Sequence, residues 1–88
     1  MRVSEIRTSS RFEKQYKKLP DVIKDSAKTK EQIFRNNSFD SRIATHKLHG
    51  AEKELWAFSI TDRDRIKFTF LNGDKVLFLE IGTHDIYS

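Results

Sequence analysis

A histidine and an arginine near the end of the chain are the residues best suited to chemistry. His84 follows a strongly β-forming segment, and Arg65 lies in the β-forming segment before that one. A histidine has a pKa near neutrality and can therefore transfer protons at physiological pH. A guanidinium stays charged and can bind two oxygens of one phosphate through its planar fork. A surface that holds both side chains predicts proton transfer beside a bound phosphate, provided that the strands place them on the same face.

The turn that sets this arrangement is the dipeptide Asn72-Gly73, between two β-rich segments. It predicts a two-residue hairpin loop of type I′, whose positive φ angles suit both residues. The loop length then determines which residues face each other. The predicted pairs are Leu71 with Asp74, Phe68 with Leu77, Ile66 with Leu79, Arg65 with Glu80, and Asp64 with Ile81. One face of this hairpin is apolar and the other is charged.

The preceding strand joins the apolar face if Ile60 pairs with Ile66 across a three-residue loop, Asp62-Arg63-Asp64. A two-residue loop would place Ile60 beside Arg65, so we discard it. The core side of the resulting antiparallel sheet carries Trp56, Phe58, Ile60, Ile66, Phe68, Leu77, Leu79 and Ile81. The other side carries Ser59, Arg65, Lys67, Thr69, Val76, Phe78 and Glu80. If the last strand continues past Gly82, side-chain alternation places His84 on this second side.

Length and composition limit the class of protein. The 88 residues allow one domain, 1–88, with one small core. The net charge of +4 favours an acidic partner, either a phosphate backbone or an acidic protein. Cysteine is absent, which excludes disulfides, a thiolate nucleophile and a cysteine zinc site. No signal peptide is evident, and no segment approaches the roughly 20 apolar residues of a membrane span, so we expect a cytoplasmic protein without membrane contact.

The histidines do not predict a metal site. His46 and His49 are three residues apart on an expected turn, and no acidic ligand is fixed beside them. We therefore expect neither a metal ion nor another cofactor.

The first third of the chain predicts a short strand, Arg2 to Thr8, followed by two amphipathic helices. Ser10 as N-cap, with Glu13 three residues later, has the pattern of a capping box. The apolar stripe of this first helix is Phe12, Tyr16 and Leu19. Pro20 ends the first helix and suits the first turn of a second helix.

The second helix is expected from Asp21 to about Arg35, and Asn36-Asn37-Ser38 is a stop signal. Its expected buried residues are Val22, Ile23, Ala27, Ile33 and Phe34. Beyond it, Phe39 is expected to pin the loop to the core, Leu48 to be a buried anchor and Gly50 to form a turn. The order strand, helix, helix, then three to four antiparallel strands predicts a two-layer α+β domain. Both helices cover one face of its sheet and leave the charged face open.

Four motifs, in order, resemble the RelE/YoeB/YafQ group of bacterial toxins within the RelE/ParE superfamily. They are Thr45-His46-Lys47-Leu48-His49-Gly50, Leu55-Trp56, Asp64-Arg65-Ile66-Lys67-Phe68 and Gly82-Thr83-His84-Asp85-Ile86-Tyr87. The pattern Phe-x-x-x-Tyr-Lys-Lys-Leu of the first helix extends the resemblance over nearly the whole chain. It implies a RelE-like fold and a ribosome-dependent endoribonuclease that cuts mRNA without a metal. It also implies a co-expressed antitoxin as partner, with which the toxin forms a hetero-oligomer.

The resemblance assigns roles to particular residues. His84 matches the C-terminal histidine that acts as general acid or base, and Arg65 matches the strand arginine that holds the scissile phosphate. His46, in a His-x-Leu-x-Gly setting, matches the first active-site histidine of YafQ-like members. Ser59 departs from the pattern, because some relatives carry a histidine or arginine there. Arg63 and Asp64 also depart, since YafQ-like members have acidic and aromatic residues at these positions.

Several cations and one aromatic residue are candidates for contacts with the nucleic acid. Lys47, Arg63 and Lys67 are candidates for phosphate contacts, since backbone charge dominates RNA affinity. Tyr87 is a candidate to stack on a base or to cover the end of the core.

Structural alternatives stay open for the same residues. His84 lies in a terminal segment where a histidine is commonly only solvated. Arg65 faces Glu80 in the predicted register, and such a cross-strand ion pair contributes about 0.2 to 1 kcal/mol. His46 shares its parity with Leu48 and is a candidate for a packed or capping histidine.

Two other functions fit the same fold. A ParE-like toxin inhibits DNA gyrase by binding and does no RNA chemistry, and a catalytically inactive module would bind only RNA or antitoxin. The retained C-terminal histidine favours the nuclease, since a gyrase-binding protein has no use for a proton donor on that face.

Overall fold

A mixed β-sheet with two helices on one side forms the protein, as seen in a computed structural model that describes residues 1–50, 54–83 and 86. Its elements are β1 (Glu5–Thr8), α1 (Ser10–Lys17), α2 (Asp21–Asn36), the 3-10 turn η1 (Ser41–Ile43), β2 (His46–Lys47), β3 (Trp56–Ser59), β4 (Arg65–Phe70) and β5 (Lys75–Gly82). Within the described residues the sheet has five strands in the order β1-β5-β4-β3-β2. β1 runs parallel to β5, and the other neighbours are antiparallel.

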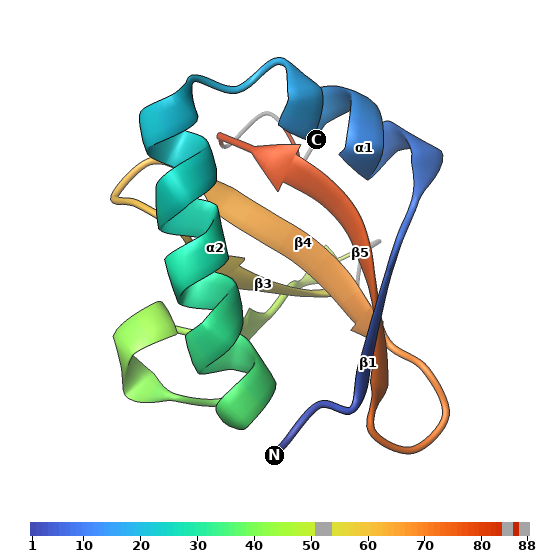
Figure 1. The fold of residues 1–88 in the computed structure, drawn as a ribbon. Helices are drawn as coiled ribbons and strands as arrows, with labels where there is room; N and C mark the ends of the chain where they lie inside the picture. Colours follow the sequence, from blue (N-terminus) through green and yellow to red (C-terminus); the bar gives the residue numbers. More distant parts are fainter. Residues whose placement is uncertain (51–53, 84–85, 87–88) are drawn as a thin grey trace.

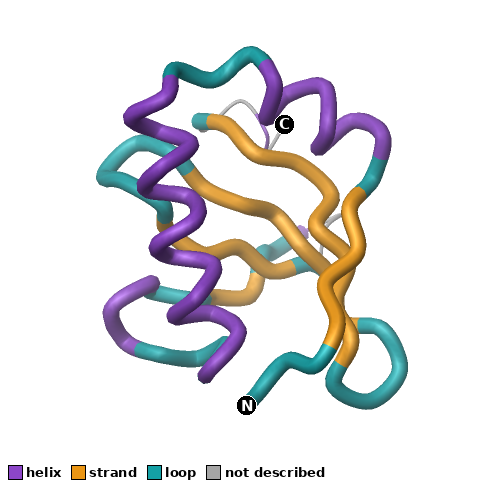
Figure 2. Tube along the Cα trace, viewed as in Figure 1, coloured by secondary structure: helices purple, strands orange, loops and turns teal. Residues whose placement is uncertain are grey.

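The two layers agree with the predicted α+β class. Figure 1 shows α2 lying across one face of the sheet and α1 beside the end of β5. Figure 2 shows the same arrangement, with the strands as one twisted layer behind α2. In the part of the chain that the structure describes, no helix is long and apolar enough to cross a membrane.

The start of α1 lies one residue before the predicted one. Ser9 is the N-cap: its backbone is extended and its Oγ accepts the N–H of Phe12 at 3.0 Å. Ser9 also donates to the carbonyl of Leu79 at 2.7 Å, so the cap residue is tied to β5. The predicted capping box is wrong, because Glu13 accepts from the hydroxyl of Thr8 instead.

α2 begins at Asp21, directly after Pro20 as predicted, and ends at Asn36, one residue beyond the expected end near Arg35. Ala27 and Phe34 are buried, but Val22 is 68% exposed, which contradicts the prediction. Val22 lies on the same helical stripe as Ser26 and Thr29, and this stripe is turned away from the sheet.

The β3–β4 hairpin keeps the predicted faces with a different register. Phe58 pairs with Ile66, and the N–H of Ile60 donates to the carbonyl of Asp64 at 2.9 Å. The loop is therefore Thr61-Asp62-Arg63, and the predicted pair of Ile60 with Ile66 is wrong. A shift of two residues leaves each side chain on its face. Phe58, Ile60 and Ile66 are buried as expected.

The β4–β5 hairpin has a longer loop than predicted. The N–H of Leu71 donates to the carbonyl of Lys75 at 2.8 Å, so the loop is Asn72-Gly73-Asp74. Gly73 has a φ of 65°, the left-handed region that favours glycine. The predicted two-residue turn is wrong because Asp74 belongs to the loop rather than to the strand.

This extra loop residue exchanges the two faces of the first half of β5. Phe68 pairs with Phe78, not with Leu77. Val76 and Phe78 are buried in the core, whereas Leu77 and Leu79 are only half-buried. The predicted assignment of these four residues to the faces is therefore wrong, as expected for a register shift of one residue.

A β-bulge restores the core side in the second half of β5. The register shifts between Lys67 and Phe68, where Leu79 is the extra residue. Ile81 consequently faces Ile66, and both are buried. The bulge thus brings Ile81 to the same side as the core residues that precede Leu79.

Aromatic rings fill the space between α2 and the sheet. Phe34 stacks on Phe58 with ring centroids 4.5 Å apart and meets Phe68 edge-on at 4.9 Å. Phe39 is 46% exposed, yet its ring packs on Trp56 at 5.4 Å, so it closes the rim of the core. Leu48 is buried, as predicted.

Candidate active site

The candidate site lies on the sheet face opposite α2, which we call the open face. Side chains of paired strand residues share a face, so the register decides which residues lie there. One row across β2, β3, β4 and β5 consists of His46, Ala57, Lys67 and Glu80. The next row consists of Ser59, Arg65 and Gly82. The register thus places an imidazole and two cations on one face.

Lys67 is the centre of the first row and is buried. Its Nζ lies 2.9 Å from Oε2 of Glu80 and donates to the carbonyl of Ile86 at 2.6 Å. Gln15 donates to Oε1 of Glu80 at 3.3 Å, and Arg11 lies 3.7 Å from the same oxygen. Lys67 therefore joins β4, β5 and the segment after β5.

The charge of Glu80 is set by these neighbours. Partial burial alone would raise the pKa of its carboxyl group, but the hydrogen bond and positive charge of Lys67 oppose this. With the further help of Gln15 and Arg11, the pKa of Glu80 is lowered from its ordinary value. Glu80 is thus a carboxylate at neutral pH and balances the buried ammonium.

Arg65 occupies the second row at the edge of the loop between β3 and β4. The predicted pair with Glu80 is wrong, because Arg65 faces Gly82 in the observed register. Its Nη1 instead donates to the carbonyls of Thr61 at 2.7 Å and Asp64 at 3.1 Å. These backbone contacts hold a half-buried guanidinium in place without neutralising its charge, which suits the binding of an anion.

The loop that holds Arg65 is itself braced. The Thr61 hydroxyl donates to a carboxylate oxygen of Asp64 at 2.7 Å and accepts the backbone N–H groups of Arg63 and Asp64. Asp64 therefore shapes the loop. Arg63 is exposed at the tip of the hairpin.

His46 is exposed at the edge of the sheet, and its tautomer follows from one contact. Its Nδ1 lies 3.0 Å from the carbonyl of Ala44, which can only accept. Nδ1 must therefore carry a proton, and in the neutral ring Nε2 is the basic nitrogen. Ala44 has a positive φ of 49°, so a sharp turn before β2 creates this contact.

Beyond β5, the carbonyl of Thr83 accepts the N–H of Ile86 at 3.1 Å. Ile86 is buried, and its Cγ2 lies 3.0 Å from where a Cβ on Gly82 would be. Gly82 therefore leaves the space that Ile86 fills. The two predicted site residues of this segment, His84 and Tyr87, lie outside the described residues.

The predicted RNA-contacting lysines are separated by the structure. Lys47 is exposed and pairs with Trp56. It follows His46 directly in β2, so its side chain is on the other face of the sheet. Lys67, in contrast, is 4% exposed and tied to its partners. Among the described residues, no cluster of histidine and acidic residues could hold a metal ion.

A hollow of about 290 Å³ adjoins the Lys67–Glu80 pair. It is lined by Ser9, Arg11, Leu55, Lys67, Leu79 and Glu80. Arg11 carries no signal in the sequence, because no local pattern predicts that the first turn of α1 packs beside β5. In this hollow the Lys67 ammonium is engaged by Glu80 and by the carbonyl of Ile86, whereas the guanidinium of Arg11 is exposed beside two leucines.

Comparison with known proteins reveals likeness in structure but not in sequence. No protein-family model matches the chain, and no curated protein matches it. Solved structures with the same fold include a YoeB/ParE toxin from Agrobacterium tumefaciens, with 12% identity, a TM-score of 0.78, and coverage of 92% of this chain and 99% of that one. The archaeal RelE–RelB complex from Pyrococcus horikoshii matches with 13% identity, a TM-score of 0.73, and coverage of 92% and 94%. The DinJ–YafQ toxin–antitoxin complex from E. coli matches with 18% identity, a TM-score of 0.74, and coverage of 98% and 97%. The chain therefore has the fold of these toxins.

Proposed function

We propose that this chain, which folds like the RelE, YoeB and YafQ toxins, is the toxin of a toxin–antitoxin pair and cleaves mRNA as an endoribonuclease. The observation that carries the proposal is the open face itself. There Arg65 is held by backbone carbonyls, and the strand register places His46 on the same face. The RelE–RelB and DinJ–YafQ complexes support an antitoxin protein as the partner.

The reaction uses the RNA's own 2′-hydroxyl as nucleophile. Its oxygen forms a bond to the adjacent phosphorus, its proton passes to a general base, and the bond from phosphorus to the 5′-oxygen breaks. A general acid protonates that leaving oxygen, which yields a 2′,3′-cyclic phosphate and a 5′-hydroxyl. No metal is required by this chemistry, and each proton transfer contributes about 10² to 10⁴ in rate.

We assign one arginine and two histidines to these steps. Arg65 stabilises the negative charge that develops on the phosphorane, which is often the larger catalytic term. His46 and His84 transfer the protons. His46 and Arg65 lie two strands apart and two residues along the sheet, about 12 Å between Cα atoms from strand spacings. Their side chains can therefore approach one nucleotide from opposite sides.

The test is cleavage of a defined mRNA by purified protein, with and without ribosomes, and the cuts are mapped by primer extension. We expect cuts by the wild type that are lost in Arg65→Ala and His84→Ala. Arg35→Ala, on α2, and His49→Ala serve as matched controls and should still cut. Full cleavage by both site variants would reject the assigned residues. A wild type that cuts no RNA but inhibits gyrase supercoiling would instead select the ParE-like function.

A further inference from the structure

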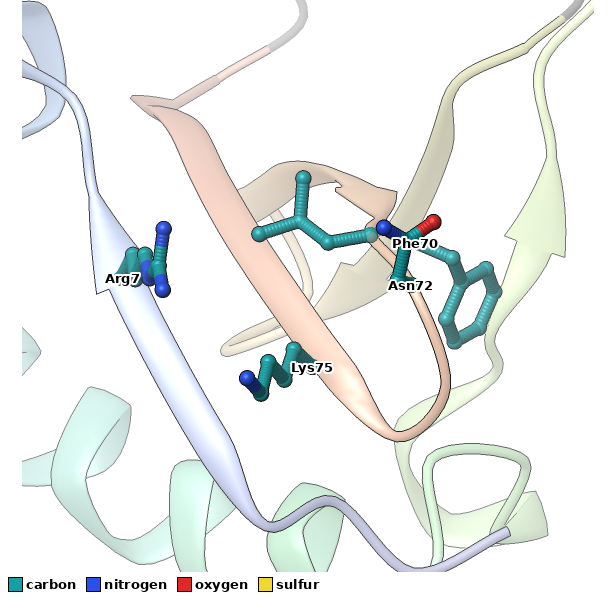
Figure 3. A pocket seen from close by; sticks show the side chains of 5 residues that line it. Arg7, Phe70, Asn72 and Lys75 are labelled. Carbon is teal, nitrogen blue, oxygen red and sulfur yellow. The ribbon is translucent and has the colours of Figure 1, made fainter.

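A second hollow on the open face lies far from Arg65, between β1 and the β4–β5 hairpin. Its volume is about 490 Å³, and it is lined by Arg7, Phe70, Leu71, Asn72 and Lys75. Figure 3 shows Arg7 and Lys75 projecting from two neighbouring strands, with Asn72 at the hairpin end. The Phe70 ring points away from the two cations and packs on Trp56 and Phe39.

The register places both cations on the same side of the sheet as Arg65. Arg7 pairs with Leu77, which in turn pairs with Thr69 of β4. Thr69 follows Lys67 by two residues and therefore shares its face. Lys75 pairs with Glu5, two residues before Arg7. The hollow is thus a continuation of the open face toward the hairpin.

Charge in this hollow is positive, although a carboxylate offsets part of it. Glu5 accepts the Nε–H of Arg7, and the pKa of Glu5 is lowered by this hydrogen bond and by the charges of Arg7 and Lys75. The bond engages only one edge of the guanidinium, so its remaining donors stay available for a further anion. Asp74 is nearby in the loop, but it accepts from the hydroxyl of Ser4 at 2.6 Å and does not line the hollow.

The distance to Arg65 fits one nucleic-acid strand. Arg65 begins β4 and Leu71 follows its last residue, so the two are six residues apart, about 20 Å at the usual rise of a strand. A stacked single strand covers this length in about six nucleotides. The intervening open-face side chains of β4 are Lys67 and Thr69, and the nearby carboxylate of Glu80 is held by Lys67. A phosphate backbone can therefore follow β4 without meeting an unbalanced negative charge.

We propose that Arg7 and Lys75 form a second phosphate-binding subsite, which holds the backbone of single-stranded RNA about six nucleotides from the phosphate at Arg65. This subsite rests on the proposed function, because the continuous face from Arg65 favours an RNA strand over an acidic peptide. Both cations bind the backbone rather than bases, so the subsite is independent of nucleotide sequence.

The experiment measures binding of a 12-nucleotide and a 4-nucleotide 2′-O-methyl RNA, neither of which can be cleaved because the nucleophile is blocked. Affinity is measured over a range of salt concentrations for wild type and Arg7→Gln/Lys75→Gln. The matched control is Lys28→Gln/Arg35→Gln, which removes the same two charges from α2. Each phosphate contact to a single strand contributes about 0.7 to the salt slope. The site variant should therefore bind the 12-mer about tenfold more weakly, with a slope flatter by about 1.4, and bind the 4-mer like the wild type.

Glu5→Gln gives a change in the opposite direction. Removing the carboxylate that competes for Arg7 should tighten binding of the 12-mer. The subsite is overturned if the site variant and the α2 control lose the same affinity, or if the slope stays at the wild-type value. Loss of binding to a polyglutamate peptide, with RNA binding unchanged, would assign the hollow to an acidic protein instead. If the wild type cuts no RNA while these binding differences hold, the endoribonuclease proposal fails and the subsite stands.

Discussion

Lys67 and Glu80 face each other across β4 and β5, and their side chains form an ion pair at 2.9 Å. The ammonium is almost completely buried, and it also donates to the carbonyl of Ile86. Burying one charge without its partner is costly, whereas a satisfied pair is tolerated. The pair therefore links the stability of the sheet to the position of the C-terminal segment.

Removing Glu80 should lower the free energy of unfolding more than removing Lys67. Glu80→Ala removes the carboxylate from a buried ammonium, and we expect a loss of about 3 kcal/mol in the free energy of unfolding. Lys67→Met keeps the apolar stem and leaves Glu80 with Gln15 and Arg11, so a loss of about half that size is expected. Urea unfolding of both variants and of the double variant measures the coupling. Equal losses for the two single variants would contradict this order.

The same pair predicts a dependence of stability on pH. Because the pKa of Glu80 is lowered below its ordinary 4.5 on folding, its charge stabilises the folded state above that pH. The contribution is lost as the pH falls through the folded-state pKa. The difference in unfolding free energy between wild type and Glu80→Gln should therefore shrink from about pH 7 to about pH 3. A difference that stays constant over this range would disprove the role of the carboxylate.

At position 82 the backbone conformation suits alanine, but the space around the residue does not. An added Cβ would lie 3.0 Å from Cγ2 of Ile86, so Ile86 must move. We expect Gly82→Ala to lose about 1 kcal/mol of stability and to expose the C-terminal segment to proteolysis. Limited proteolysis followed by mass spectrometry measures this. Gly82→Ala/Ile86→Ala, which removes the contact, should not be cut faster than Ile86→Ala alone.

Gly73 tests the observed hairpin loop. Its φ is 65° and no atom lies within 4 Å of an added Cβ, so the cost of a substitution is one of backbone conformation alone. We expect Gly73→Ala to lose about 1 kcal/mol and Gly73→Asn to lose less, because asparagine tolerates this region. Thermal unfolding of both variants gives the order. A more stable Gly73→Ala would show that the loop has another conformation.

Cleavage should depend on the shape of the cation at position 65 as well as on its charge. Arg65→Lys keeps the charge but loses the planar guanidinium, whose Nη1 is held by two loop carbonyls, and we expect a fall of about 10²-fold in the cleavage rate constant. His46→Gln should lower the same constant by about 10²-fold or more. Single-turnover cleavage measures both, with His49→Gln as control. Wild-type rates in Arg65→Lys would mean that a point charge suffices.

The layers of the fold were predictable because they depend on periodicity. The stripe of α1, Pro20 between the helices and the alternation in β3 each indicate their element locally. The register of β5 was not predictable. The sequence Asn72-Gly73-Asp74 is compatible with a loop of either two or three residues, and the two loops give different registers. The bulge depends on α1 as well, since Ser9 and Gln15 bond to the backbone of β5 on either side of Glu80.

The candidate site was predictable where alternation along one strand was sufficient. Arg65 and Lys67 share a face whatever the register of β5. Which of the two cations faces Glu80 depends on the third residue of the β4–β5 loop and on the bulge at Leu79. The expected partner of Glu80, Arg65, was therefore wrong. The contact of Arg65 with the Thr61 carbonyl arises from loop geometry and has no signal in the sequence.

The parallel pairing of β1 with β5 has a consequence for how the chain is made. Glu5 is matched with Lys75, so β1 has no partner strand until β5 has been synthesised. Contacts between such distant residues slow folding. The sheet is therefore completed only after β5 has left the ribosome, and a shorter nascent chain cannot display the finished open face.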